Sequence, residues 1–221
     1  MLLRPGEIEA TGWRVEKLSD VLQRLRDASP GVVGRPRVFA IDGRGGAGKS
    51  TLVERLRMIV PASGVVHTDD VAWNHAFFDW GGVMIENILR PLHRSEAVEF
   101  RPPAWIEHDR PGAIRVRSDV DVVWVEGTGI IREEFTQWID ASIWIQGDLD
   151  EQERRLVARD GDSAAQQRHV AEWLAEEVPL LLREQPWHQA TIIVAGTTPL
   201  DHNPDTEVVV ASPTAPRPRR C

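Results

Sequence analysis

The sequence lacks several features, and each absence excludes a class of protein. Its only cysteine is Cys221, so no intramolecular disulfide can form. No apolar run approaches the ~20 residues that a membrane-spanning helix requires. Residues 1–10 contain no apolar core of the signal-peptide type. We therefore expect a cytoplasmic protein with no membrane partner.

Tyrosine is also absent, and the charge balance is far from basic. The formal net charge is −8, which argues against nucleic acid as a partner. No two of the seven histidines have a metal-ligand spacing such as H-x-x-x-H, which disfavours a histidine metalloenzyme. We expect most of the nine tryptophans to lie in the core.

The chain is long enough for one domain with a sizeable core. It has 221 residues, of which 42% are hydrophobic and 27% are charged, as in soluble globular proteins. No internal repeat and no second domain are visible. We predict a single domain over residues 1–211, followed by a disordered tail over residues 212–221 that is rich in proline and arginine.

The strongest signal is a glycine-rich stretch over residues 38–51. An apolar run ends in glycines, and a helical pattern follows. Gly43, Gly48, Lys49 and Ser50 match the phosphate-binding pattern G-x-x-x-x-G-K-[ST] in every required place. Glycines allow a tight turn with several N–H groups aimed at an anion, and the following helix adds its positive N-terminal end. We predict that this loop binds a nucleotide through Gly43, Gly45, Gly46, Ala47, Gly48, Lys49, Ser50 and Thr51.

Carboxylates follow two predicted strands. The strand over residues 64–68 runs into Asp69 and Asp70, and the strand over residues 121–127 ends at Glu126. Ligands bind at the carboxyl ends of parallel strands, so these acids are candidate site residues. One aspartate is also expected to act as a helix N-cap. In a chain with a phosphate-binding loop, Glu126 together with Ser50 is the predicted Mg²⁺ site.

Two further segments are candidates for substrate contacts. Residues 101–112 form a proline-rich, charged loop that contains Trp105 and Arg110. An ordinary surface loop with Trp105 beneath it explains this composition almost as well. Residues 150–165 form a candidate lid, in which Arg155 and Arg159 share a helix face.

The arginine-bearing helix also has a simpler interpretation. A solvated face, paired with Glu151 and Glu153, accounts for its charges without a ligand. Acidic residues over 148–150 favour a helix start there.

Alternation of strands and helices from residue 37 to residue 195 predicts an α/β protein with a mainly parallel sheet between two helical layers. Pro179 is expected to kink or split one helix. The predicted helices cover residues 13–28, 49–60, 83–92 and 164–185, and the predicted strands cover 37–41, 64–68, 121–127, 141–146, 191–195 and an edge strand at 207–211.

These motifs, in this order over residues 37–197, resemble the uridine kinase branch of P-loop kinases, which includes phosphoribulokinase, pantothenate kinase and glycerate-kinase-like proteins. The resemblance implies a three-layer αβα P-loop kinase fold that uses ATP and Mg²⁺. By this resemblance Asp69 accepts the proton of the substrate hydroxyl and Glu126 associates with Mg²⁺. It also implies that the arginine helix is the lid and that Gly196 packs near adenine.

The sequence departs from the uridine kinase pattern in three places. Residues 70–73 replace a Ser-Phe-Tyr-like run, and residues 102–106 replace a Pro-x-Tyr-Asp core. The spacing from Arg155 to Arg159 is one residue longer than expected, which leaves open which arginine contacts phosphate. The kinase assignment therefore rests on more residues than the uridine assignment.

We accordingly predict phosphoryl transfer from a nucleotide to the hydroxyl of a small molecule, with a nucleoside such as uridine as one candidate. Kinases for a sugar, an antibiotic or another polyol stay open. So do a nucleotide-dependent ATPase or switch and a nucleotide-binding protein without an acceptor. The sequence contains neither an Asn-Lys-x-Asp motif nor an ABC-type signature, which argues against the switch. The sequence does not choose between ATP and GTP, and it does not fix whether the chain forms a homo-oligomer.

Overall fold

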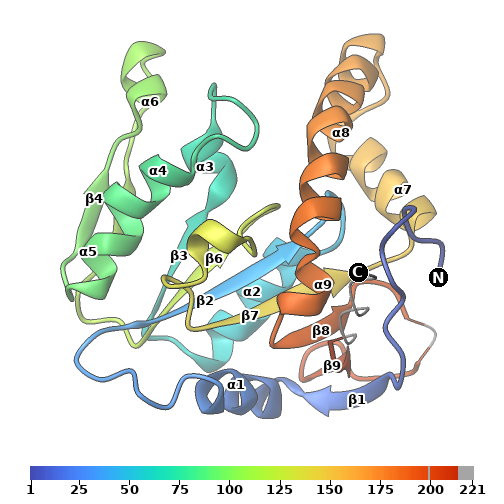
Figure 1. The fold of residues 1–221 in the computed structure, drawn as a ribbon, viewed down its shortest axis with the longest axis horizontal. Coiled ribbons are helices and arrows are strands. Elements are labelled where there is room, and N and C mark those ends of the chain that lie inside the picture. The colour runs from blue at the N-terminus through green and yellow to red at the C-terminus, as the bar shows by residue number, and fades with distance from the viewer. Residues whose placement is uncertain (199, 214–221) are drawn as a thin grey trace, which may run out of the picture.

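The computed structural model describes residues 1–198 and 200–213, and a seven-stranded sheet forms its centre (Figure 1). The strand order is β1-β9-β8-β7-β2-β6-β3. The five strands from β8 to β3 are parallel, whereas β9 and β1 are antiparallel additions at one edge. The bounds are Arg14–Lys17 (β1), Arg37–Gly43 (β2), Ser63–His67 (β3), Val122–Glu126 (β6), Ala141–Gln146 (β7), Ile192–Ala195 (β8) and Glu207–Ala211 (β9).

Both faces of the sheet are covered, as the alternation of apolar residues along each strand requires. In β2, Phe39 and Ile41 pack on one side with helices α1 and α2, while Val38 and Ala40 pack on the other. The helices are α1 (Leu18–Asp27), α2 (Lys49–Ile59), α7 (Leu149–Asp160), α8 (Ala164–Glu184) and α9 (Pro186–Gln189). The predicted α/β class and three-layer αβα arrangement are confirmed.

Residues 68–116 rise from the sheet as a separate group of short elements, opposite the group formed by α7 and α8 (Figure 1). The predicted helix over residues 83–92 is present but contains a π-helical segment, and it ends at His93. The predicted loop over residues 101–112 contains a short helix and sits on a two-stranded ribbon. The elements are α3 (Thr68–Ala72), α4 (Gly81–Met84), η1 (Ile85–Leu89), α5 (Arg90–His93), β4 (Val98–Phe100), α6 (Pro103–Glu107) and β5 (Ile114–Val116), and η2 (Glu133–Phe135) lies between the groups.

The structure corrects two predictions about the sheet edge. The helix predicted from residue 13 begins only at Leu18, because residues 14–17 pair as β1 with β9. For the same reason β9 is not an edge strand: it lies between β1 and β8. The apolar residues of the first segment fit a helical face, but pairing with a distant strand determines its conformation.

The prediction for Pro179 was a kink or a split, and the split is wrong, because helix α8 runs through Pro179 without a break. Proline removes one N–H donor, and the remaining bonds of this 21-residue helix keep it continuous. Of the tail predicted over residues 212–221, residues 214–221 lie outside the described part of the chain. In the described residues, no helix combines the length and the apolar character needed to cross a membrane.

Candidate functional site

The glycine-rich loop joins β2 to α2 and has the backbone shape of an anion cradle. Gly46 and Gly48 have φ angles of 73° and 100°, a region that side chains with a Cβ disfavour. Gly48 is the N-cap of α2, so the loop ends at a helix N-terminus. Lys49 Nζ donates to the carbonyl oxygens of Gly43 (2.8 Å) and Arg44 (3.1 Å). The lysine ammonium group therefore lies against the loop.

Glu126 at the end of β6 joins this loop to the end of β3. Its Oε1 accepts a hydrogen bond from Ser50 Oγ at 3.0 Å and hydrogen-bonds with His67 Nδ1 at 2.5 Å. Burial acts to raise the pKa of Glu126, but the bond with His67 and the charge of Lys49 hold it below its usual value. In turn, the hydrogen bond with Glu126 raises the pKa of His67. Glu126 is therefore a carboxylate beside Ser50.

The two predicted aspartates lie on α3, directly after β3. Asp69 is exposed and is near enough to Arg159 of α7 to raise the pKa of that arginine, although the bond with Asp160 is the larger cause. Asp70 accepts from Arg110 at 2.5 Å. Neither aspartate is an N-cap, since α3 begins at Thr68 and its N-cap is His67. The capping prediction is wrong because the helix starts two or three residues earlier in the chain than expected.

The tip of the β4–β5 hairpin is fastened to α3 through Arg110. Its guanidinium stacks over Trp105 at 3.8 Å from the ring centroid and lies 5.1 Å from Trp73. The indole N–H of Trp105 donates to the backbone oxygen of Asp70 at 2.9 Å. Trp105 is 5% exposed, as the surface-loop interpretation expected. The hairpin tip, α3 and Asp70 thus form one packed unit beside Asp69.

Helix α7, the predicted lid, lies directly on the glycine-rich loop. A Cβ at Gly46 would stand 2.5 Å from the backbone oxygen of Gln152, so only glycine fits there. Arg155 Nη1 donates to the carbonyl oxygens of Gly46 (3.3 Å) and Gly196 (3.1 Å). Arg155 therefore links the loop to the 195–197 segment, which was predicted to lie near adenine. Its neighbour Glu151 also accepts from it, as the solvated-face interpretation expected.

Gly196 follows β8 and packs against the loop as well. A Cβ added there would stand 2.5 Å from the backbone oxygen of Ala47. The structure thus brings together Lys49, Ser50, Glu126, Arg155 and Gly196 at the carboxyl end of the sheet. Thr51 belongs to α2, while Trp105 and Arg110 lie on the hairpin tip.

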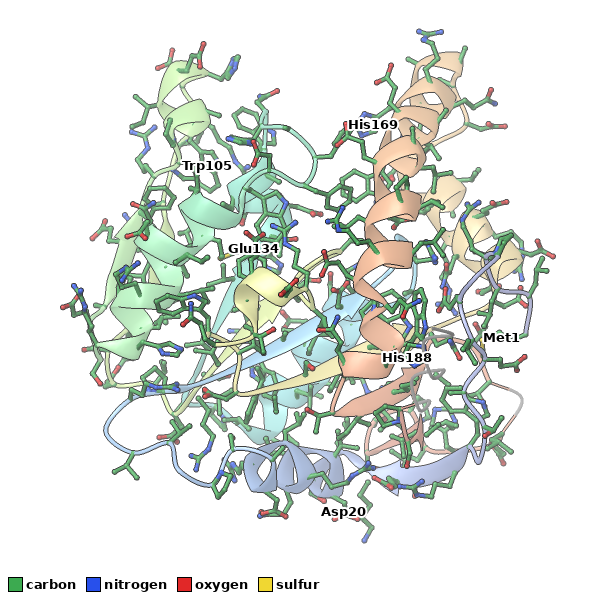
Figure 2. All side chains as sticks on the ribbon, viewed as in Figure 1. Met1, Asp20, Trp105, Glu134, His169 and His188 are labelled. Atoms are coloured by element: carbon green, nitrogen blue, oxygen red, sulfur yellow. The ribbon has the colours of Figure 1, made fainter. Side chains whose placement is uncertain are left out.

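At the carboxyl end of the sheet, the segment before α4 contacts α8 through aromatic side chains. The rings of Phe77 and Phe78 lie 5.2 Å and 4.8 Å from that of Trp173. Figure 2 shows Trp105 on the hairpin side and His169 on α8, in the two opposed groups of elements. These aromatic contacts connect the two groups above the sheet.

The sequence interpretation missed a buried ion-pair group behind the loop. Arg44, a variable position of the motif, pairs with Glu7 and with Glu177 of α8, each at 3.0 Å. All three side chains are at most 5% exposed. Glu7 is far from Arg44 in sequence, and Glu177 farther still, so no local pattern could reveal this contact.

A second missed residue is Asp42, the last side chain of β2 before the loop. Its carboxylate accepts from the N–H groups of Gly43, Gly129 and Ile131 at 2.7, 3.0 and 2.8 Å. Burial raises the pKa of Asp42 to about 6. A polar residue within an otherwise apolar strand was the available signal. Asp42 fixes the loop start against the turn that follows β6.

The oxygen ligands of Ser50 and Glu126 suit a magnesium ion that is also held by phosphate. Mg²⁺ prefers oxygen ligands and is commonly bound by one or two carboxylates together with substrate phosphates and water. The 3.0 Å separation between Ser50 Oγ and Glu126 Oε1 places both on one side of the loop. Within residues 1–198 and 200–213, no group of three or more His, Cys, Asp or Glu side chains could hold a metal by itself. Ser50 and Glu126 are thus the residues that would hold Mg²⁺, with phosphate and water supplying further oxygen ligands.

Sheet order, loop and strand-end acids together define a P-loop kinase fold, and solved structures share it. A fructose transport system kinase from Silicibacter sp. TM1040 is 22% identical, with a TM-score of 0.57 over 75% of this chain and 94% of that protein. D-glycerate 3-kinase from Cryptococcus neoformans var. grubii is 15% identical, with a TM-score of 0.54 over 80% of this chain and 93% of that protein. No protein-family model and no curated protein matches the chain. At these identities the likeness establishes the fold.

Proposed function

We propose that the protein transfers the γ-phosphoryl group of ATP to a hydroxyl of a small molecule. The observation that carries the proposal is the convergence at Glu126. Its carboxylate meets Ser50 of the phosphate loop and His67, two residues before Asp69. A phosphate cradle, a metal-ligand pair and a carboxylate are the parts that phosphoryl transfer requires.

Each residue then has a defined task. The loop N–H groups bind the phosphates, and the Lys49 ammonium offsets their charge. Ser50 and Glu126 would hold Mg²⁺, which supplies further charge neutralisation when bound. Asp69 accepts the proton of the acceptor hydroxyl as its oxygen bonds to the γ-phosphorus. The bond from that phosphorus to the bridging oxygen breaks, and ADP leaves.

The two lid arginines divide between the two substrates in this proposal. Arg155 donates hydrogen bonds to the carbonyl oxygens of Gly46 in the glycine-rich loop and of Gly196, so we assign it to the nucleotide. The hydrogen bond with Asp160 is the main cause that raises the pKa of Arg159, and the charge of Asp69 adds to it, so we assign Arg159 to the transferred group and the acceptor. Closure of this helix excludes water, which would otherwise hydrolyse ATP.

The acceptor is proposed only as a small hydroxyl compound. A nucleoside such as uridine would need an aromatic ring on which its base can stack. Trp105 is only 5% exposed, and Arg110 is already stacked on its ring. That arrangement favours a sugar or polyol over a nucleobase. Asp69 and the Asp70–Arg110 pair supply hydrogen-bonding groups that suit hydroxyls.

The test is ADP release from Mg-ATP with a panel of acceptors: uridine, cytidine, sugars, pantothenate, glycerate and aminoglycosides. The proposal predicts that one acceptor class raises the rate well above the rate without acceptor. Lys49→Ala is the control, and it should lower that rate by about 1,000-fold or more. Equal rates with and without every acceptor would favour the ATPase or switch.

A further inference from the structure

A surface groove lies at the end of the sheet opposite the phosphate loop. Its volume is about 660 Å³, within the range of small-molecule sites. It is formed by the ends of α1, β2 and β6 and the loops that precede the two strands. Its lining includes the arginines Arg26, Arg35 and Arg37 and the valines Val32, Val33 and Val120.

The groove is separate from the candidate active site. Arg37 is the first residue of β2, and the glycine-rich loop begins at Gly43, the last residue of that strand. Six residues of extended chain place the two about 20 Å apart. A ligand in the groove therefore does not occupy the phosphate loop.

Two arginines in the groove have no hydrogen-bond or ion-pair partner in the described part of the chain. Arg26 and Arg37 are half-buried, and neither side chain forms a hydrogen bond or ion pair with the described residues. The Nε of Arg37 is buried without an acceptor. Most other arginines of the described chain do have partners, and Arg94 and Arg168, which form no hydrogen bond or ion pair there, are exposed.

An unpaired donor in a buried position is unfavourable, because no protein acceptor replaces the water that it loses. An anion that accepts from both arginines removes this penalty. The other charges of the groove do not neutralise them: Arg35 is paired with Asp140, and Asp119 is paired with Arg117. Among the described residues that line the groove, Asp121 is the remaining carboxylate, against the two guanidinium groups of Arg26 and Arg37. The groove is thus locally cationic on a protein of net charge −8.

We infer that this groove binds a small organic molecule that carries a phosphate group. Guanidinium forks match phosphate oxygens in paired, charge-assisted hydrogen bonds. Val32, Val33 and Val120 give the groove an apolar wall for the body of the ligand, and Val33 is 88% exposed. The volume fits a metabolite rather than a protein segment.

The experiment titrates inorganic pyrophosphate, without magnesium, into the full chain carrying Lys49→Ala. This background weakens anion binding at the phosphate loop. Calorimetry is expected to show one remaining site, which Arg26→Gln with Arg37→Gln weakens by about tenfold or more. The control pair Arg94→Gln with Arg168→Gln removes the same charge from exposed positions and should change the affinity by less than about twofold.

Three results overturn the inference: no pyrophosphate binding in the Lys49→Ala background, equal loss in the control pair, or unchanged affinity in the groove pair. Malonate serves as a second probe, and binding as tight as that of pyrophosphate would overturn the phosphate assignment. Thermal denaturation reports whether each variant is folded. Should the groove pair unfold, the single variants Arg26→Gln and Arg37→Gln give the same test, each with a smaller loss.

Discussion

Arg44 Nη1 donates to Glu177 Oε2 across 3.0 Å, which ties the phosphate loop to helix α8 in the interior. Glu7 accepts from the same guanidinium, so the chain start is part of this connection. Figure 1 shows the first residues beside α7 and α8. The loop therefore depends on contacts far outside its own motif.

Replacement of Glu177 by glutamine should lower the free energy of unfolding by about 2 kcal/mol or more, because it removes a buried partner of Arg44. Urea denaturation measures this change. Glu54→Gln is the matched control, since Glu54 pairs with Arg57 on the surface and should cost less than about 1 kcal/mol. Equal losses for both variants would show that the buried group has no special role.

Arg155→Ala should raise the KM for ATP by about tenfold, because its guanidinium bridges the loop and Gly196. Arg154 is the control: it is adjacent, pairs with the same Glu151 and is 73% exposed in its side chain. Arg154→Ala should leave the KM for ATP within about twofold. Similar effects in steady-state kinetics would support the solvated-face interpretation instead.

Arg110→Gln should release the hairpin tip from α3, since it removes both the bond to Asp70 and the stacking on Trp105. Amide hydrogen exchange over residues 103–107 should then accelerate, and the KM for the acceptor should rise while the KM for ATP is unchanged. Arg115→Gln, which removes an exposed pair with Glu99 on the same hairpin, is the control. Unchanged exchange in Arg110→Gln would mean that other contacts hold the tip.

The pKa of Asp42 predicts a pH dependence of stability. Burial raises this pKa to about 6 from an ordinary value of 3.8, so the folded protein binds the proton more tightly than the unfolded chain. The contribution of Asp42 to the free energy of unfolding therefore decreases as pH rises from about 4 to above 6, by an amount on the order of 3 kcal/mol.

Asp42→Asn removes this titration. Urea denaturation should show that the free energy of unfolding of Asp42→Asn falls furthest below that of the wild type near about pH 4.5. The difference should be smaller near about pH 7.5. Parallel pH profiles for the two proteins would contradict the raised pKa.

The sequence predicted the parallel core of the sheet and the residues at its carboxyl end, because these depend on local patterns. An apolar run, glycines and a helical pattern in succession specify a strand, a loop and a helix near Gly48. The acids at 69, 70 and 126 follow predicted strands, so the parallel order places them together.

Other features depend on contacts between distant segments, which no local pattern contains. Residues 14–17 form a strand only because β9 is available to pair with them. The partners of Arg44 come from the chain start and from α8, and the close fit of α7 on Gly46 is a property of packing. Trp105 was predicted to lie in a proline-rich, charged loop, and the short helix and two-stranded ribbon found there were not predicted. That Arg110 covers its ring is a tertiary property.

The most direct test of the kinase account compares Asp69→Asn with the wild type in acceptor-dependent ADP release, with ATP affinity measured in parallel. If Asp69 accepts the proton of the acceptor hydroxyl, turnover should fall by about 100-fold or more. ATP affinity should stay within about twofold, because Asp69 is on α3 and makes no contact with the phosphate loop's Lys49 or Ser50 in the hydrogen bonds of the described residues. Turnover close to that of the wild type would contradict the assignment of Asp69 as the base.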